Sequence, residues 1–135
     1  MSTQTHHGSC HCGRVTFQVD LDLDAGTGRC NCTFCLKARH WATIVKPAAF
    51  KLLSGEADLS DYRGRNPHGH NYFCKHCGVR PYSTGHVAEL GGDYVSVSVS
   101  CLDDVAPEAL VAGKITYFDG RNNAWMQQPH FVGHL

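Results

Sequence analysis

The chain has 135 residues, of which 42% are hydrophobic and 18% charged, so it can bury a core and does not fit the disordered class. Its 12 basic and 12 acidic side chains cancel, and no cluster of Lys or Arg stands out, which argues against nucleic acid and membranes as partners. We expect residues 1–135 to form a single domain, and no apolar run approaches the roughly 18 residues of a membrane span.

The first half of the chain is predicted to form four strands. Apolar residues alternate with polar ones over residues 14–19, and the mostly apolar residues 41–45 are typical of a buried strand. Residues 50–53 and 59–62 also have strand character. The turn-forming residues 54–56 between them predict that these two strands pair as a hairpin.

The second half has three further strand candidates. Residues 70–73 and 82–84 are short, and residues 94–101 form the clearest strand because valine and serine alternate strictly there. The alternation puts Cys101 on the same face as the three valines, where a free cysteine behaves as a small hydrophobe. We therefore predict that Cys101 belongs to the core and binds no metal.

Helix is scarce in this sequence. Residues 33–39 can form one or two turns with Thr33 as N-cap. Residues 106–110 can form another short helix with Pro107 at its first position. Together with the strands, this predicts an all-β fold with little helix.

Eight cysteines are the anomaly in the composition. Residues 1–8 are polar and lack the apolar segment of a secretory signal, so the reducing cytoplasm is the expected location. Seven cysteines lie in three short knots, where they are poorly placed for disulfides with each other and well placed to chelate an ion. The knots are Cys10 with Cys12, then Cys30 with Cys32 and Cys35, then Cys74 with Cys77.

The first and third knots together supply four thiolates, which is the ligand set of a closed structural zinc site. Gly13 and Gly78 each follow the second cysteine of a pair, where a glycine lets the backbone turn tightly around the sulfurs. We predict that zinc binds to four residues: Cys10, Cys12, Cys74 and Cys77. The alternative is a set of free buried cysteines, which the spacing disfavours.

The middle knot offers three thiolates within six residues: Cys30, Cys32 and Cys35. Three protein ligands leave the fourth position of a zinc ion open, as in catalytic sites. The alternative is a closed site whose fourth ligand is Cys101 or one of the ten histidines. With both sites filled, we expect two zinc ions per chain.

Other polar residues give weaker signals. His68 and His70 precede the third knot and could approach a metal, although an exposed loop histidine is the alternative for each. Several arginines could hold anionic groups of a substrate, although each alone fits a solvated surface charge. They are Arg39, Arg63, Arg65 and Arg80.

Three motifs in this order and spacing carry a resemblance to a known family. They are HGSCHCG at residues 7–13, CxCxxC at residues 30–35 and FCxxCG at residues 73–78. With DGR at residues 119–121, the chain resembles the glutathione-dependent formaldehyde-activating enzymes, a family that also includes centromere-protein-V-like proteins. The resemblance implies an all-β, Mss4-like fold of several small antiparallel sheets around zinc sites.

The resemblance also implies roles for the metal sites. The first site would be structural, and the second zinc, on Cys30, Cys32 and Cys35, would receive the thiol of glutathione. The reaction implied is a carbon–sulfur lyase activity that joins glutathione and formaldehyde into S-hydroxymethylglutathione, with a small thiol as the partner. We add His70 as the candidate general acid. The alternatives are a non-catalytic glutathione carrier and a zinc-stabilised interaction module.

Overall fold

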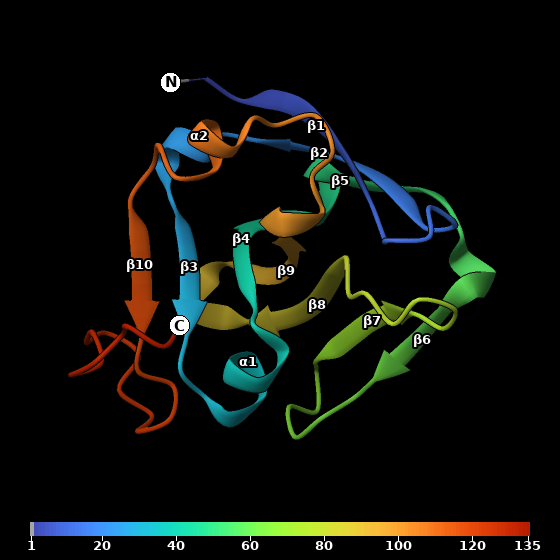
Figure 1. The fold of residues 1–135 in the computed structure, drawn as a ribbon. Helices are drawn as coiled ribbons and strands as arrows, with labels where there is room; N and C mark the ends of the chain where they lie inside the picture. The colour runs from blue at the N-terminus through green and yellow to red at the C-terminus, as the bar shows by residue number, and fades with distance from the viewer. Residues whose placement is uncertain (1) are drawn as a thin grey trace.

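The computed structural model describes residues 2–135, and strands dominate it (Figure 1). The strands are β1 (Gln4–Ser9), β2 (Thr16–Leu21), β3 (Thr27–Cys30), β4 (Trp41–Val45), β5 (Phe50–Ser54), β6 (Leu59–Tyr62), β7 (His70–Cys74), β8 (Tyr82–Val87), β9 (Gly92–Ser98) and β10 (Ile115–Phe118). The helices are α1 (Thr33–Ala38) and α2 (Pro107–Leu110). The predicted all-β class with little helix is confirmed. Over residues 2–135, no helix has the length and apolar character needed to cross a membrane.

The strands form two sheets. The smaller has the order β1-β2-β5, and the larger has the order β10-β3-β4-β9-β8-β7-β6. Neighbouring strands are antiparallel except β10 and β3, which run parallel. Figure 1 shows the small sheet crossing one end of the larger sheet, which curves from β10 round to β6. The sheets are therefore fewer and larger than the several small antiparallel sheets that we expected.

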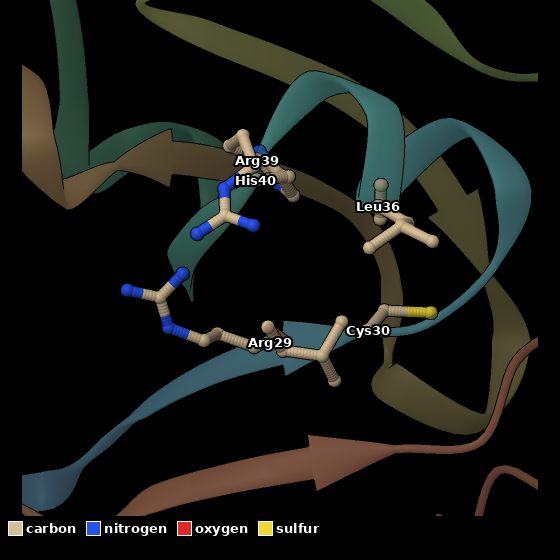
Figure 2. A pocket seen from close by; sticks show the side chains of 7 residues that line it. Arg29, Cys30, Leu36, Arg39 and His40 are labelled. Carbon is tan, nitrogen blue, oxygen red and sulfur yellow. The ribbon is translucent and has the colours of Figure 1, made fainter. Parts of the chain in front are cut away.

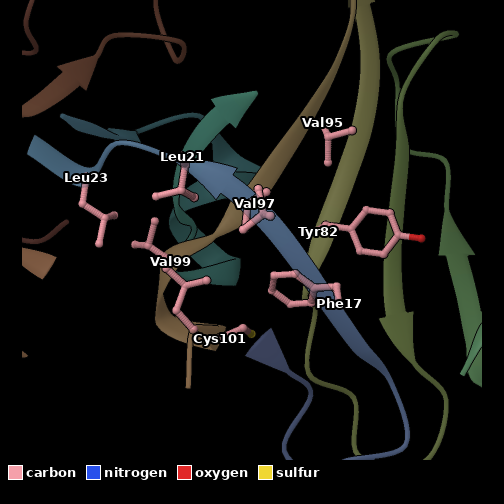
Figure 3. Close-up of a cluster of buried hydrophobic side chains, with 10 residues drawn as sticks. Phe17, Leu21, Leu23, Tyr82, Val95, Val97, Val99 and Cys101 are labelled. Carbon is pink, nitrogen blue, oxygen red and sulfur yellow. The ribbon is translucent and has the colours of Figure 1, made fainter. Parts of the chain in front are cut away.

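The core lies between the two sheets (Figure 3). Phe17 and Val19 of β2 are fully buried against Val97 of β9. Removing side chains of this size from water contributes about 1.5–3 kcal/mol each. Phe50 of β5 stacks on Phe17 with ring centroids 5.4 Å apart. This packing fixes the small sheet on the large one.

The hairpin predicted over residues 50–62 is wrong. Both strands exist, but β5 pairs with β2 in the small sheet, whereas β6 pairs with β7 in the large sheet. The turn residues between them form a 3-10 helix, Glu56–Asp58, through which the chain leaves one sheet for the other. The aromatic contact of Phe50 with Phe17 keeps β5 on β2, and this long-range contact outweighs the local turn signal.

Two predicted boundaries also change. Helix α1 begins as expected, but its N-cap is Cys32, whose Sγ accepts a hydrogen bond from the backbone N–H of Cys35 (3.3 Å). Strand β9 ends at Ser98, and Val99–Cys101 form a 3-10 turn. Three strands were not predicted from the sequence: β1, β3 and β10. They are polar or very short, and their neighbours in the sheets supply the pairing that stabilises them.

Candidate functional site

The first and third cysteine knots come together in the structure. The sulfur atoms of Cys10, Cys12, Cys74 and Cys77 all lie within 4.8 Å of one another, a group that could hold a metal ion. The Sγ atom of Cys12 lies 3.7 Å from that of Cys10 and 3.6 Å from that of Cys74. Cys10 follows β1 and Cys74 ends β7, so this cluster joins the small sheet to the large one.

The two knots are built alike. The backbone N–H of Cys10 donates to Val15 O (3.0 Å), and that of Cys74 donates to Val79 O (2.9 Å). The glycine that follows each pair has a positive φ, 84° at Gly13 and 77° at Gly78. Side chains other than glycine rarely adopt this conformation, so the prediction of a glycine-dependent tight turn is confirmed at both knots.

The four cysteines of the first cluster differ in how deeply they are buried. Cys10 and Cys74 are buried, while Cys12 is exposed. Burial raises the pKa of the Cys10 thiol to about 11. Hydrogen bonds from the backbone and the guanidinium of Arg14 lower the pKa of Cys12. Because metal ligands must be thiolates, a cation that neutralises the charge is what makes a buried set of this kind stable.

The middle knot forms a second group that could hold a metal ion. The sulfur atoms of Cys30, Cys32 and Cys35 lie within 4.8 Å of one another. Cys30 ends β3, Cys32 caps α1 and Cys35 lies in the first turn of α1. The backbone N–H of Cys32 also donates to the Sγ atom of Cys30 (3.3 Å). All three cysteines are half-buried, so this cluster faces solvent on one side.

Hydrogen bonds within the second cluster bias where its negative charge lies. The hydrogen bond between Cys35 and Cys30 lowers the pKa of Cys30 to about 6. The same bond, together with burial, raises the pKa of Cys35. At neutral pH the metal-free cluster therefore holds a thiolate at Cys30, and metal binding must displace the proton from Cys35.

Asn31, inside the middle knot, anchors the second cluster to the C-terminal part of the chain. Its backbone N–H donates to Phe118 O (3.2 Å), and its side-chain Nδ2 donates to Asp119 Oδ1 (2.9 Å). Arg121 donates from its backbone N–H to Asn31 Oδ1 (3.0 Å) and from Nε to Asn31 O (3.2 Å). Hydrogen bonds from Asn122 and Asn31 hold the pKa of Asp119 below its usual range. The DGR segment is thus hydrogen-bonded to the loop that carries the second cysteine cluster.

Gly120, the middle residue of the DGR segment, lies against the second cluster. A Cβ atom at this position would lie 2.6 Å from Cys30 Sγ and 2.6 Å from Cη2 of Trp125. Real Cβ atoms do not approach so closely, so any larger residue would displace the Cys30 ligand or the segment that holds Asn31.

We therefore expect Gly120→Ala to weaken metal binding at the second cluster by about 10–100-fold, the usual effect of changing groups that support ligands. Competition with a chromophoric chelator, followed by metal analysis, measures this for both clusters in one sample. The four-cysteine cluster is the internal control and should keep its affinity. Unchanged affinity at the second cluster would show that the close contact of Gly120 does not matter.

Cys101 lies apart from both clusters. It is 8% exposed and packs in the main core with the three valines of the predicted face. Its Sγ atom lies 3.9 Å from Arg80 O. Within residues 2–135, the groups that could hold a metal do not include it. The apolar environment predicted from the alternation is confirmed, even though the strand ends before this residue.

Cys101→Val conserves shape and apolarity, so we expect a folded protein with the same metal content as the parent. Swaps of similar volume in a core usually cost less than about 1.5 kcal/mol. Metal analysis of the purified variant and a thermal melt suffice as measurements. A fall in metal content by one ion per chain would instead make Cys101 a ligand and close the second cluster.

A histidine–arginine pair lies beside the second cluster. The guanidinium of Arg80 donates from Nη2 to His40 Nδ1 (2.8 Å) and from Nη1 to Asn71 Oδ1 (2.9 Å). Since guanidinium only donates, Nδ1 of His40 must accept, and Nε2–H then donates to Ser96 Oγ (3.2 Å). Burial, with the nearby charge of Arg80, lowers the pKa of His40 to about 4, so the ring is neutral. Both ring nitrogens are therefore engaged by protein side chains, and neither is free to contact a substrate.

His70, the candidate acid, belongs to neither cysteine cluster in the described part of the chain. It lies in β7, where its Nδ1 is 2.6 Å from Asp61 Oδ2 and its ring stacks on Tyr72. The other oxygen of Asp61 accepts a hydrogen bond from the backbone N–H of Asn71 (3.0 Å). Asn71 in turn accepts from Arg80, whose guanidinium lies 4.6 Å from the ring centroid of Phe34 in α1. A chain of contacts thus links His70 to the helix that carries Cys35.

Sequence reasoning found the cysteines and missed the residues that surround them. Asn31 stands inside a predicted knot, and its position between two ligands was the available signal. Arg29 and His40 lie next to the middle knot in the chain, but no motif marks them. Asp119 and Gly120 stood out only as part of the DGR segment of the family resemblance, and their contact with the middle knot comes from the fold. A cleft of about 320 Å³ next to the second cluster also emerges only from the fold, and its lining includes Asn31, Leu36, Phe131 and His134.

Comparisons with known proteins agree with this picture. The family described as glutathione-dependent formaldehyde-activating enzyme matches residues 5–119, a range that includes all of the clustered cysteines. A crystal structure of a protein from Rhodobacter sphaeroides is similar, with a TM-score of 0.68 and 27% sequence identity. The alignment covers 82% of this chain and 98% of that one. The two sheets and the cysteine clusters fit the Mss4-like fold.

Proposed function

The chain belongs to the glutathione-dependent formaldehyde-activating enzyme family, and we propose that it joins a small thiol, such as glutathione, to a small carbonyl compound, such as formaldehyde. The reaction is that of a carbon–sulfur lyase working in the direction of addition. The observation that carries the proposal is the cluster of three half-buried cysteines beside a separate cluster of four. Three ligands leave a position for a thiol, whereas four do not.

Zinc is the proposed metal at both clusters. Sets of three and four thiolates suit zinc because thiolates are soft ligands and the ion accepts tetrahedral coordination. Cys10, Cys12, Cys74 and Cys77 would hold one ion, and Cys30, Cys32 and Cys35 the other. A zinc ion in the second cluster would lower the pKa of an incoming thiol, so that the thiol is held as a thiolate at neutral pH.

In the proposed reaction the chain holds the thiol and the carbonyl compound together and supplies a proton to the adduct. The thiol loses its proton, its sulfur forms a bond to the carbonyl carbon, and the electron pair of the C=O double bond moves to oxygen. That oxygen takes up one proton, which balances the proton lost by the thiol. The product of glutathione and formaldehyde is then S-hydroxymethylglutathione. Holding the two reactants together makes the step effectively unimolecular, which can supply much of the rate gain. The cleft of about 320 Å³ lies at the small end of the 300–1,000 Å³ range of small-molecule sites.

Calorimetric titration of the zinc-loaded protein with glutathione tests the proposal, and binding at micromolar to millimolar concentration is expected. The absence of binding heat would contradict it. The rate of adduct formation, followed by NMR in the same buffer with and without protein, then separates an enzyme from a carrier. A carrier would bind glutathione and leave the spontaneous rate unchanged.

His70 is the proposed proton donor for the oxygen of the adduct. Its hydrogen bond to Asp61 (2.6 Å) orients the ring, and partial exposure lets a substrate reach it. We expect His70→Gln to lower turnover by about 10²-fold or more, the usual effect of removing a general acid, with glutathione affinity unchanged. Steady-state rates and calorimetry measure the two quantities. Equal loss of both, or of neither, would remove His70 from this role.

The proposed compartment is the reducing cytosol. All eight cysteines are free thiols in the structure, and a site that works through thiolates requires them to stay reduced. Oxidation of the three-cysteine cluster would abolish metal binding there, which is why a reducing environment fits the proposed function.

A further inference from the structure

Two arginines face each other across a small pocket beside the second cysteine cluster (Figure 2). Arg29 reaches in from β3 and Arg39 from the end of α1. Cys30 and Cys35 form part of its wall, and its cavity volume is about 10 Å³. That is roughly the room that one water-sized group needs, so the pocket can take only the charged end of a ligand, and the rest of the ligand must lie outside it.

The side chain of Arg29 is held in position by the ring of Trp41. Its guanidinium carbon lies 4.6 Å from the ring centroid of Trp41. The indole N–H of Trp41 is itself bound to Thr27 Oγ1 (2.7 Å), which holds the ring in place. A guanidinium stacked on an aromatic ring keeps its N–H groups free in the plane of the fork. Arg29 can therefore still bind a carboxylate with its edge.

Arg39 is aimed at the pocket by an unusual backbone. It ends α1 with φ of 53°, in the left-handed region where helices usually place glycine. This conformation is strained for a residue other than glycine, and such strain gathers at functional sites. Nη1 of Arg39 donates to His134 O (2.8 Å), which steadies the side chain.

The two arginines form no ion pair with a carboxylate. The ion pairs among residues 2–135 involve other residues. None of the described residues that line the pocket has a carboxylate side chain, and the lining also includes the thiols of Cys30 and Cys35 and the last residue, Leu135. His40, a further lining residue, accepts from Arg80 and adds no negative charge. Two guanidinium groups that converge on one space repel each other, and an anion between them removes that repulsion.

We propose that Arg29 and Arg39 bind a carboxylate of the thiol received by the neighbouring cysteine cluster, so that the site selects acidic thiols over neutral ones. This inference rests on the proposed function, because it takes the sulfur of the ligand to lie at the second cluster. The sulfur and the carboxylate are then the two anchors of the substrate. The rest of the ligand extends outside the small pocket.

A matched pair of thiols tests the inference on the zinc-loaded protein. N-acetylcysteine carries a carboxylate, and its amide has the same size without the charge. Calorimetry gives the affinity of each, and the parent protein should favour the acid. In Arg29→Met and Arg39→Asn the acid-to-amide affinity ratio should fall by about tenfold or more, with the affinity for the amide unchanged, because charged hydrogen bonds to the acid are lost. Asn tolerates the left-handed backbone, so the second variant keeps the fold of the helix end.

Lys51→Met is the control, since Lys51 is an exposed cationic side chain of β5 outside the pocket, and its ratio should equal that of the parent. A second measurement needs no variant: added salt should weaken binding of the acid and not that of the amide. Equal ratios in the parent and both pocket variants would overturn the inference and leave thiol binding intact. A fall in the Lys51 variant too would overturn it in favour of general surface charge. Binding of neither thiol would contradict the proposed function, and the inference with it.

Discussion

Replacement of Cys74 by serine is expected to unfold the protein. Cys74 is fully buried at the end of β7, and its cluster ties the loop after β1 in the small sheet to the large sheet. Structural zinc sites contribute on the order of 10 kcal/mol in small zinc-binding peptides, whereas whole domains are stable by only about 5–15 kcal/mol. Loss of this one ligand therefore removes a large share of the total stability.

Three thiolates left around a buried site add to the damage, because charges without a cation inside a protein are costly. We expect Cys74→Ser to be insoluble, or to show no cooperative thermal transition by circular dichroism. Chelation of metal from the parent protein at neutral pH should lead to the same state. A soluble variant with a cooperative melt close to that of the parent would contradict a structural role for the cluster.

Replacement of Cys35 by serine is expected to have the opposite profile, with loss of function and a preserved fold. The three ligands of this cluster lie within residues 30–35, so the metal there closes a short segment and does not join the sheets. Helix α1, which carries Cys35, contains no buried residue. Serine is nearly isosteric with cysteine, so the core formed by β2 and β9 stays intact.

We expect Cys35→Ser to bind one metal ion fewer per chain, to melt cooperatively, and to lose detectable binding of glutathione. Metal analysis, circular dichroism and calorimetry measure the three quantities. Cys101→Val serves as the matched cysteine control, since it should change none of them. If Cys35→Ser and Cys74→Ser unfolded alike, the distinction between a structural and a functional metal site would be wrong.

The cysteine clusters could be predicted from the sequence because their geometry is mostly local. A spacing of one or two residues between cysteines presents both sulfurs to one point, and a following glycine permits the turn, as the φ angles of Gly13 and Gly78 confirm. The burial of Cys101 was likewise predictable from period two. The N-cap of α1 was predicted wrongly, because the Cys32 sulfur takes the role that the sequence suggested for the Thr33 hydroxyl.

Which strands pair with each other could not be predicted from the sequence. The turn signal at residues 54–56 favoured a hairpin, yet β5 and β6 lie in different sheets because each finds a better partner far along the chain. Pairing energy depends on which faces the partners bury, and this is a property of the assembled core. The same applies to β10, whose parallel pairing with β3 brings residues 119–121 to the middle knot.

The all-β class, the two groups of clustered cysteines and the family could be predicted from the sequence, since they follow from composition and from spacing over a few residues. The residues that surround the second cluster could not, because the fold brings them there. It brings Gly120 against Cys30 from ninety residues away, and it turns Arg29 and Arg39 toward one pocket. Such contacts join elements whose separation in the chain carries no signal, because their approach is fixed by sheet order and core packing, and not by any local preference.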